Sequence, residues 1–314
     1  MARYTVRRII QAIPILIFIS FISFFIIRLT PGDPVKVFIT PQMTHEQIER
    51  TRANLGLDKP IYVQYFYWIK NILRGDLGYS FINYQPVSKE ISERFLPTIG
   101  LMGISLLISI ILSILLGIAS AIHKDKFIDN LISKICYIGI SIPSFWFAMI
   151  LIYIFSMKLK LLPSIGMRTI GVYSILDLMK HGIMPSIVLS YPNTAILTRY
   201  IRARLIDEMK ESYVKTAKSK GISQRQIFYS HILRNSLLPM ITILGMNLPS
   251  LVSGAFITET IFGWPGMGKL GVSSIFNFDY PVIMAITMMS SIMLVLGNLI
   301  SDICYSLVDP RISL

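Results

Sequence analysis

The sequence predicts an all-α membrane protein with six transmembrane helices. Of its 314 residues 53% are apolar, only 15% are charged, and the mean hydropathy is +0.62. This is too apolar for a soluble globular domain, in which about a quarter of the residues are charged. We find no internal repeat or low-complexity linker that would divide the chain into soluble domains.

The first apolar run covers residues 9–29. At about 1.5 Å of rise per residue it reaches roughly 30 Å, the thickness of a bilayer's hydrocarbon core. Arg3, Arg7 and Arg8 precede it, as in a signal peptide, but the run is longer than a signal's apolar core and no Ala-x-Ala cleavage site follows. We therefore expect residues 1–30 to be retained as a helix that crosses from inside to outside.

Four further runs are long enough to cross a bilayer with some tilt. They are 97–122, 131–157, 237–262 and 282–308. A fifth run, 183–198, is short and contains two prolines, so its length alone does not decide whether it crosses.

The charge pattern favours a crossing at 183–198. Without it, residues 158–236 would form one external loop with 13 Lys and Arg residues. Loops rich in Lys and Arg tend to stay inside. With six crossings, 15 Lys and Arg lie on the inner side and 5 lie in the two short outer loops, 158–182 and 263–281. The net charge of +13 is then explained by cytoplasmic loops and not by a nucleic-acid partner.

The predicted organisation follows from these crossings. Residues 31–96 form an extracytoplasmic segment, residues 97–308 form a five-helix core, and residues 309–314 form a cytoplasmic tail. Both termini face the cytoplasm, and the protein resides in the cell membrane as a multi-pass protein.

Prolines within the predicted spans have two interpretations. Pro143, Pro192 with the adjacent Asn193, and Pro249 are candidates for kinks that line a path through the membrane. The alternative is ordinary packing, because Gly and Pro are commoner in membrane helices than in soluble ones.

The sequence lacks the groups expected of a membrane enzyme or an ion-coupled pump. Glu259 and Asp302 fall near span ends, and neither has an oppositely charged residue at helical spacing. The four histidines fall in predicted loops without metal-ligand spacing, so we expect no metal site. Residues 263–270 match the GxxxxGK phosphate loop except at Leu270, where Ser or Thr would hold magnesium. We therefore expect no catalytic residues and no cofactor on this chain.

The longest predicted inner loop, 199–236, is also the most basic. Leu205, Met209, Tyr213 and Ala217 repeat every four residues, which predicts a narrow apolar stripe on one charged helix. Gly221 ends that helix in left-handed geometry. Ser223, Gln224, Arg225 and Gln226 then form a capping box, which opens a second short helix that continues into the fifth span. This helical hairpin is either a solvated connector or an element that docks into a groove on a soluble protein.

The loop resembles a known family. Residues 213–221, followed by residues 231–239, are similar to the cytoplasmic loop of B-type ABC-importer permeases of the dipeptide, oligopeptide and nickel family. In the wider family the loop begins Glu-Ala-Ala; here Lys215, Thr216 and Ala217 stand at those places, so only Ala217 and Gly221 agree.

Other blocks resemble the same family in order along the chain. They are Pro-Gly-Asp-Pro at 31–34, Leu-Gly-Leu-Asp-Lys-Pro at 55–60, Arg-Gly-Asp-Leu-Gly-Tyr-Ser at 74–80, Ser-Ile-Pro-Ser-Phe-Trp at 141–146, Phe-Gly-Trp-Pro-Gly-Met-Gly at 262–268, Asp-Tyr-Pro at 279–281 and Val-Asp-Pro-Arg at 308–311. Each block is weak by itself, but seven in order are specific.

The resemblance implies the type I ABC-importer permease fold and a transport subunit that is not itself an enzyme. Such a permease pairs with a second, related permease, two cytoplasmic ATPases that bind ATP and magnesium, and an extracytoplasmic solute-binding protein. The loop residues Met209, Tyr213, Ala217, Gly221, Ser223 and Arg225 would then couple to an ATPase. The expected substrate is a di- or oligopeptide; a nickel chelate or glutathione is the alternative within the family, and a stand-alone secondary transporter or channel is the rival class.

Overall fold

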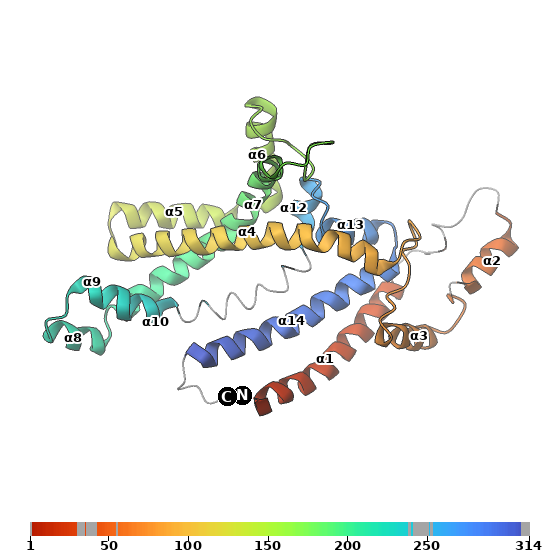
Figure 1. The fold of residues 1–314 in the computed structure, drawn as a ribbon, viewed down its shortest axis with the longest axis horizontal. Helices are drawn as coiled ribbons and strands as arrows, with labels where there is room; N and C mark the ends of the chain where they lie inside the picture. The colour runs from red at the N-terminus through yellow and green to blue at the C-terminus, as the bar shows by residue number, and fades with distance from the viewer. Residues whose placement is uncertain are drawn as a thin grey trace. The chain divides into compact units, whose positions relative to one another are not determined.

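The computed structural model describes residues 2–29, 35, 43–54, 56–237, 240, 251 and 254–308, with side chains included except at 2–6, 9 and 301–308. Within these residues the chain is helical, with one isolated bridge between Tyr79 and Pro86 and no strand (Figure 1). This confirms the predicted all-α class. The elements are α1 (Ala2–Leu29), α2 (His45–Asn54), α3 (Ile61–Leu73), α4 (Val87–Ile122), α5 (Phe127–Ser141), α6 (Ser144–Leu151), η2 (Ile152–Lys158), α7 (Ile175–Glu208), α8 (Ser212–Ser219), α9 (Gln224–Ile227), η3 (Phe228–Ile232), α10 (Leu233–Leu237), α12 (Phe256–Ile261), α13 (Met267–Phe276) and α14 (Tyr280–Val308).

The chain divides into two compact units. The first comprises Met1–Ile99, Leu248–Phe256 and Pro265–Leu299. The second comprises Gly100–Asn247, Ile257–Trp264 and Ile300–Leu314.

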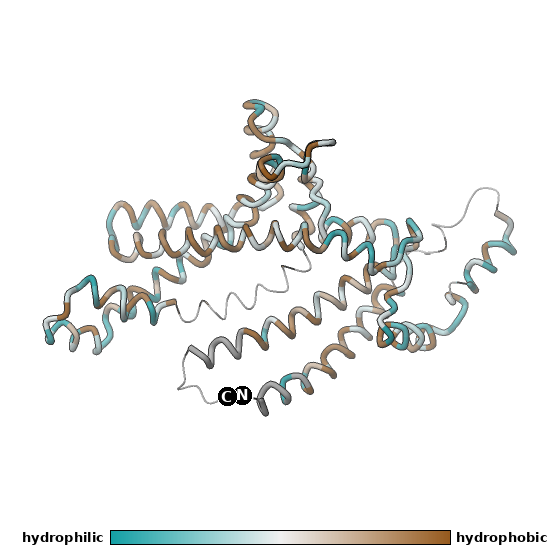
Figure 2. Tube along the Cα trace, viewed as in Figure 1, coloured by the Kyte–Doolittle hydropathy of each residue, from teal (hydrophilic) through white to brown (hydrophobic). Residues whose placement is uncertain are grey.

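Three of the described helices are long and apolar enough to cross a membrane. They are Ile10–Leu29 within α1, Val87–Ile122 and Tyr280–Ile300 within α14. In Figure 2 α1 and α14 are mainly brown, the colour of hydrophobic residues. They coincide with the first, second and sixth predicted spans, which identifies the chain as a multi-pass membrane protein. Helix α4 begins inside the segment 31–96, ahead of the predicted start at residue 97.

The third predicted span, 131–157, is not one straight helix. Phe127–Ser141 and Ser144–Lys158 are bent by 103° where they meet, and together they count as a fourth span only if the bent pair is one crossing. The break lies at Ile142, whose ψ of 124° is extended. Proline disfavours the helical region for the residue before it, and Pro143 follows Ile142 directly. Pro143, named from the sequence as a candidate kink, lies at this bend, and whether the bent pair makes one crossing stays a prediction.

The structure describes the two remaining predicted spans to different extents. The run 183–198 lies in the middle of α7, which continues through Pro185 and Pro192 as one 34-residue helix but does not reach the apolarity of the other spans. Most of the run 237–262, with Pro249, lies outside the described residues. The six-span count therefore stays a prediction.

The core of the first unit lies where the start of α4 meets α13 and α14. Val87 and Ile91 pack there with Met267, Val282 and Ile286. Gly268 lets α13 approach the backbone at Phe256 closely, because a Cβ at its position would lie 2.7 Å from the backbone nitrogen of Phe256. Burial of such side chains contributes about 1.5–3 kcal/mol each.

In the second unit, α4 and α7 approach closely along a row of small residues. Ser105, Ser109, Ser113, Gly117 and Ala121 follow one another at intervals of four, which places them on one helical face. The Ser109 hydroxyl lies 3.0 Å from the Ser190 carbonyl oxygen of α7. A Cβ at Gly117 would lie 2.7 Å from Ile201 Cγ2. Small residues let membrane helices pack backbone to backbone.

Candidate functional site

The basic segment 199–236 forms a helical hairpin at the end of α7 (Figure 1). Helix α7 runs to Glu208, a turn leads into α8, and α9, η3 and α10 follow without interruption to Leu237. The order of helix, glycine, short helix and onward helix was predicted from the sequence.

Gly221 ends α8 in a Schellman motif. Its φ is +79°, and its amide donates to the Lys218 carbonyl while the Ile222 amide donates to the Ala217 carbonyl. These are the two bonds that satisfy the last carbonyls of a helix when the following residue adopts left-handed geometry. A Cβ at Gly221 would meet nothing within 4 Å, so glycine is favoured here by its backbone and not by crowding.

Ser223 caps the second helix. Its hydroxyl accepts from the Gln226 amide at 3.3 Å, which is the first half of the predicted capping box. Arg225, beside it in α9, is exposed.

The predicted stripe does not lie on a single helix. Helix α7 ends at Glu208 and α8 begins at Ser212, so Leu205 precedes the break while Tyr213 and Ala217 follow it. Charge explains the break, because Glu208 would oppose the helix dipole at the end of α7 whereas Glu211 favours it at the start of α8.

The stripe is covered by the hairpin itself. Leu205, Val214, Ile227 and Ile232 are buried together, and three predicted site residues pack against them: Met209, Tyr213 and Ala217. Tyr213 also donates to Glu208 Oε2 at 2.6 Å, and burial together with this bond raises the pKa of Tyr213 to about 12. The apolar stripe therefore holds α8 against α9 and the end of α7.

The outer face of the hairpin is polar and basic. Its exposed side chains from α8 to α9 are those of Ser212, Lys215, Thr216, Lys218, Ser219, Lys220, Ser223, Gln224, Arg225 and Gln226. Such a surface fits both alternatives for the hairpin, a solvated connector and a surface that binds a partner through charge and hydrogen bonds.

An ion pair between the buried Asp129 and the partly exposed Arg202, which was not predicted from the sequence, holds the base of the hairpin. Arg202 donates from Nε and one terminal nitrogen to the two Asp129 carboxylate oxygens, each at 2.6 Å. Asp129 is 2% exposed and also accepts from the Ser120 hydroxyl and the Asp125 amide. The ends of α4, α5 and α7 thus meet at one carboxylate. Their placement at the ends of consecutive predicted spans is the signal that could have paired Asp129 with Arg202.

The predicted kink residues that the structure describes lie on different elements. Pro143 stands at the bend between α5 and α6, whereas Pro192 and Asn193 lie inside the unbroken α7. The Asn193 side chain donates to the Leu189 carbonyl at 3.5 Å, within its own helix.

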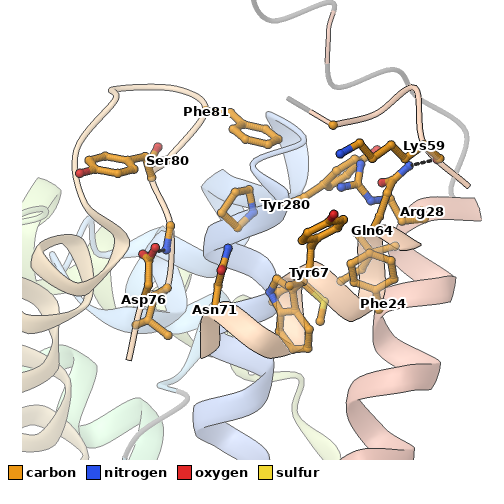
Figure 3. A pocket seen from close by; sticks show the side chains of 18 of the residues that line it. Phe24, Arg28, Lys59, Gln64, Tyr67, Asn71, Asp76, Ser80, Phe81 and Tyr280 are labelled. Carbon is orange, nitrogen blue, oxygen red and sulfur yellow. Dashed lines mark hydrogen bonds between the residues drawn. The ribbon is translucent and has the colours of Figure 1, made fainter. Parts of the chain in front are cut away.

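A cavity of about 480 Å³ lies in the first unit, among the end of α1, helix α3, the loop 76–84 and the start of α14 (Figure 3). Aromatic rings form much of its wall, including Phe24, Tyr67, Trp68 and Tyr280. The Arg28 guanidinium lies between two of them, 5.5 Å from the Phe24 ring and 5.2 Å from the Tyr280 ring. Such cation–π contacts hold a charge at an apolar wall.

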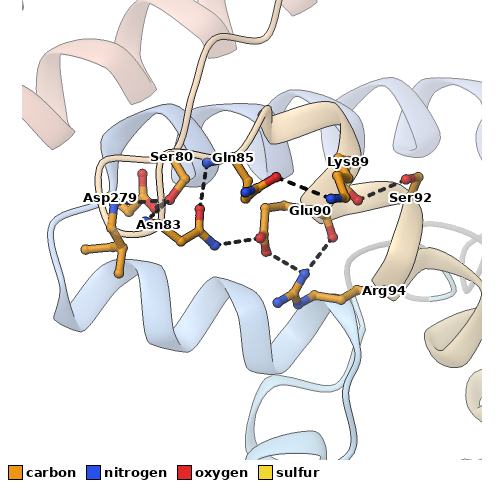
Figure 4. Close-up of polar contacts among 9 residues, drawn as sticks. Ser80, Asn83, Gln85, Lys89, Glu90, Ser92, Arg94 and Asp279 are labelled. Carbon is orange, nitrogen blue, oxygen red and sulfur yellow. Dashed lines mark hydrogen bonds and ion pairs between the residues drawn. The ribbon is translucent and has the colours of Figure 1, made fainter.

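A polar network organises the loop beside this cavity (Figure 4). Asp279 accepts from the Ser80 hydroxyl at 2.5 Å and from the Phe81 amide at 3.0 Å. Asn83 donates to Glu90, which also pairs with Arg94 at 2.5 Å. Burial raises the pKa of Asp279, although its hydrogen bonds act in the opposite direction. Two of the family-like blocks, 74–80 and 279–281, thus meet through a hydrogen bond.

The segment 263–270, which resembles a phosphate loop, has a backbone amide that is hydrogen-bonded within the protein. The Met267 amide, at the start of α13, donates to the Thr98 hydroxyl at 2.7 Å. Around the described side chains, no three His, Cys, Asp or Glu residues are grouped as metal ligands.

Apolar helices combined with a basic helical hairpin define a multi-pass membrane protein with an exposed polar surface. The chain belongs to the family of binding-protein-dependent transport system inner membrane components, whose family model matches residues 113–314. The model of the N-terminal part of these membrane components matches residues 1–102. It is thus a permease subunit of ABC importers, as the resemblance indicated.

Three relatives match nearly the whole chain. The oligopeptide transport system permease protein AppB of Bacillus subtilis is 42% identical over 314 residues, 99% of each chain. A putative peptide permease of Brucella suis is 37% identical over 316 residues, again 99% of each. The glutathione transport system permease protein GsiC of Escherichia coli K12 is 35% identical over 312 residues, with the same coverage.

Proposed function

We propose that this chain forms half of the translocation pathway of an ATP-driven importer of di- or oligopeptides. In this proposal it pairs with a second, related permease, two cytoplasmic ATPases that bind ATP and magnesium, and an extracytoplasmic solute-binding protein. The observation that carries the proposal is the hairpin at the end of α7: a rigid, basic, capped unit in a chain whose family serves binding-protein-dependent transport.

The proposed orientation follows the charge distribution. Six crossings with both termini in the cytoplasm place the hairpin 199–236 beside the ATPases and the segment 31–96 on the outer side, with the core at 97–308 and the tail at 309–314. The cavity at Arg28 and the Ser80–Asp279 loop then lie toward the binding protein.

The hairpin couples ATP hydrolysis to transport by acting as a lever. Its exposed side chains, Arg225 and Ser223 among them, contact the ATPase. The packed side chains Met209, Tyr213 and Ala217 transmit the movement, because they join α8 to the end of α7. Closure of the ATPase pair would then rock the membrane helices between inward- and outward-facing states.

Gly221 provides the test. Gly221→Val forces a β-branched residue into left-handed geometry at a cost of about 1–2 kcal/mol, which distorts the end of α8. We expect the reconstituted complex to keep its ATPase activity while peptide uptake falls several-fold. Gly221→Asn is the matched control, because Asn tolerates this geometry, and it should keep both activities. Normal uptake by Gly221→Val contradicts the lever.

Peptides are the proposed substrate because two of the relatives described above are peptide permeases by name and the third transports glutathione, itself a tripeptide. Glutathione is the second candidate on the same grounds, and a nickel chelate is the third within this family. Binding of labelled peptides, glutathione and a nickel chelate to the partner solute-binding protein, followed by uptake into vesicles, discriminates among them. Uptake by the chain alone, without an ATPase, would favour a secondary transporter or channel.

A further inference from the structure

We infer that α3 lies in the membrane interface, with one apolar face inserted among lipid acyl chains, although it belongs to the segment 31–96 that links the first two spans. The inference rests on the geometry of α3 against α1 and is independent of the transported substrate.

The first observation is the depth at which α3 contacts α1. The Tyr65 hydroxyl lies 2.8 Å from the Ser20 hydroxyl, and the Tyr65 ring lies 5.5 Å from Phe21. Ser20 precedes Leu29, the last residue of the candidate span Ile10–Leu29, by nine residues, which corresponds to about 13 Å along the axis. Helix α3 therefore packs against the second half of this span and not beyond its end.

The second observation is that α3 has two different faces. Gln64, Tyr67, Trp68 and Asn71 line the cavity of the first unit. Tyr62, Phe66, Ile69 and Leu73 are spaced four, three and four residues apart, which places them on one stripe on the opposite side of the helix. Of this stripe, Tyr62 is 69% exposed, Phe66 is 67% exposed and Leu73 is 81% exposed. An exposed apolar stripe of this size marks an interaction surface.

The occupant of this stripe is lipid. Helix α3 contacts α1 at Phe21 through Tyr65, and Ile17, Phe18 and Phe21 are exposed apolar residues of the candidate span, as expected for side chains that face acyl chains. Lys59 and Arg74 flank α3, Lys70 lies in its last turn, and all three are exposed, as expected for cations at the headgroup level. A helix with an apolar aromatic stripe and basic flanks is typical of an interfacial helix whose apolar face lies about 5–10 Å inside the boundary.

Spin-label accessibility tests the inference on the full-length chain in lipid nanodiscs. In a variant with both native cysteines, Cys136 and Cys304, replaced by alanine, a nitroxide is attached at Tyr62→Cys, Phe66→Cys or Leu73→Cys. The matched control is Asn71→Cys, exposed on the cavity side of the same helix.

We expect all three stripe positions to be accessible to oxygen, which partitions into lipid, and shielded from a water-soluble nickel chelate. Their ratio of oxygen to nickel accessibility should exceed that at Asn71 several-fold. High nickel accessibility on the stripe would show that it faces water, and shielding from both reagents would show that protein covers it. Either result overturns the inference.

Discussion

Asp129 and Arg202 are joined by a two-point ion pair in which the carboxylate is almost fully buried. Removing one partner of a buried pair leaves an uncompensated charge and costs about 3–5 kcal/mol. We therefore expect Arg202→Ala to lower the thermal midpoint strongly in detergent. The double variant Asp129→Ala, Arg202→Ala should recover part of the loss, because no charge is left buried.

The control for this prediction is Lys210→Ala. Lys210 lies 3.8 Å from Asp207, and both side chains are more than 60% exposed (68% and 67%), so this pair contributes about 0–1 kcal/mol. Equal midpoints for Arg202→Ala and Lys210→Ala would show that the buried pair does not stabilise the second unit.

The raised pKa of Asp279 predicts that the stability of the protein depends on pH. Burial raises the pKa of its carboxyl above the unfolded value. Between the two values the folded state binds the proton more strongly, so stability falls as the pH rises through this interval. Asp279→Asn removes the titration, and its side-chain oxygen still accepts from the Phe81 amide. We expect the variant to gain thermal stability relative to the wild type at neutral pH and not at acidic pH. A constant difference at every pH would contradict the assignment.

Some residue-scale features could be predicted from local sequence. Gly221 and Ser223 act through their own backbone neighbours, so a few residues of sequence suffice to predict the helix end and the cap. Asp129 and Arg202 are 73 positions apart. Ser80 and Asp279 are 199 apart. For Asp129 and Arg202 the signal in the sequence is their placement at the ends of consecutive predicted spans, whereas Ser80 and Asp279 have no local signal that joins them.

Helix α9, the second short helix of the hairpin, depends on its N-terminal cap, Ser223. Ser223→Ala removes the acceptor for the Gln226 amide, a loss of about 1 kcal/mol. We expect faster hydrogen exchange at the α9 amides with little change in α7. Ser219→Ala is the control, because Ser219 only bonds to the Lys215 carbonyl within α8. Unchanged exchange in α9 would show that η3 and α10 hold it without the cap.

Apolar runs in the sequence predicted the positions of helices more accurately than the positions of their bends. The run 131–157 is uniformly apolar, and hydropathy does not register the extended backbone that Pro143 imposes on Ile142. The stripe residues from Leu205 to Ala217 are four apart in sequence although the helix breaks at Lys210, because α7 and α8 both pack on the same buried cluster. Their spacing therefore reflects tertiary packing and not one continuous helix.

The topology of the whole chain depends on whether α7 crosses the membrane. Six crossings place Lys124 and Lys218 on one side and Arg168 and Lys269 on the other. In the cysteine-free chain, single cysteines at the first two positions should react with an impermeant maleimide only in inside-out vesicles. Cysteines at the other two should react only in right-side-out vesicles. If 183–198 does not cross, Lys218→Cys will react from the same side as Arg168→Cys.

For the molecule as a whole, composition and the order of short blocks were sufficient to predict the all-helical class and the family. Both are distributed over the entire chain, and the relatives match 99% of it. The cavity at Arg28 was not predicted, because its wall combines residues from α1, α3, the loop 76–84 and α14.

Helix α7 has a mechanical consequence. Its 34 residues make a rod about 50 Å long, and it is fastened to α4 at Ser190 and Ile201 and clamped at Arg202. In the proposed lever, these contacts would carry a movement of the hairpin from the end of α7 to α4, along a helix that is continuous from Ile175 to Glu208.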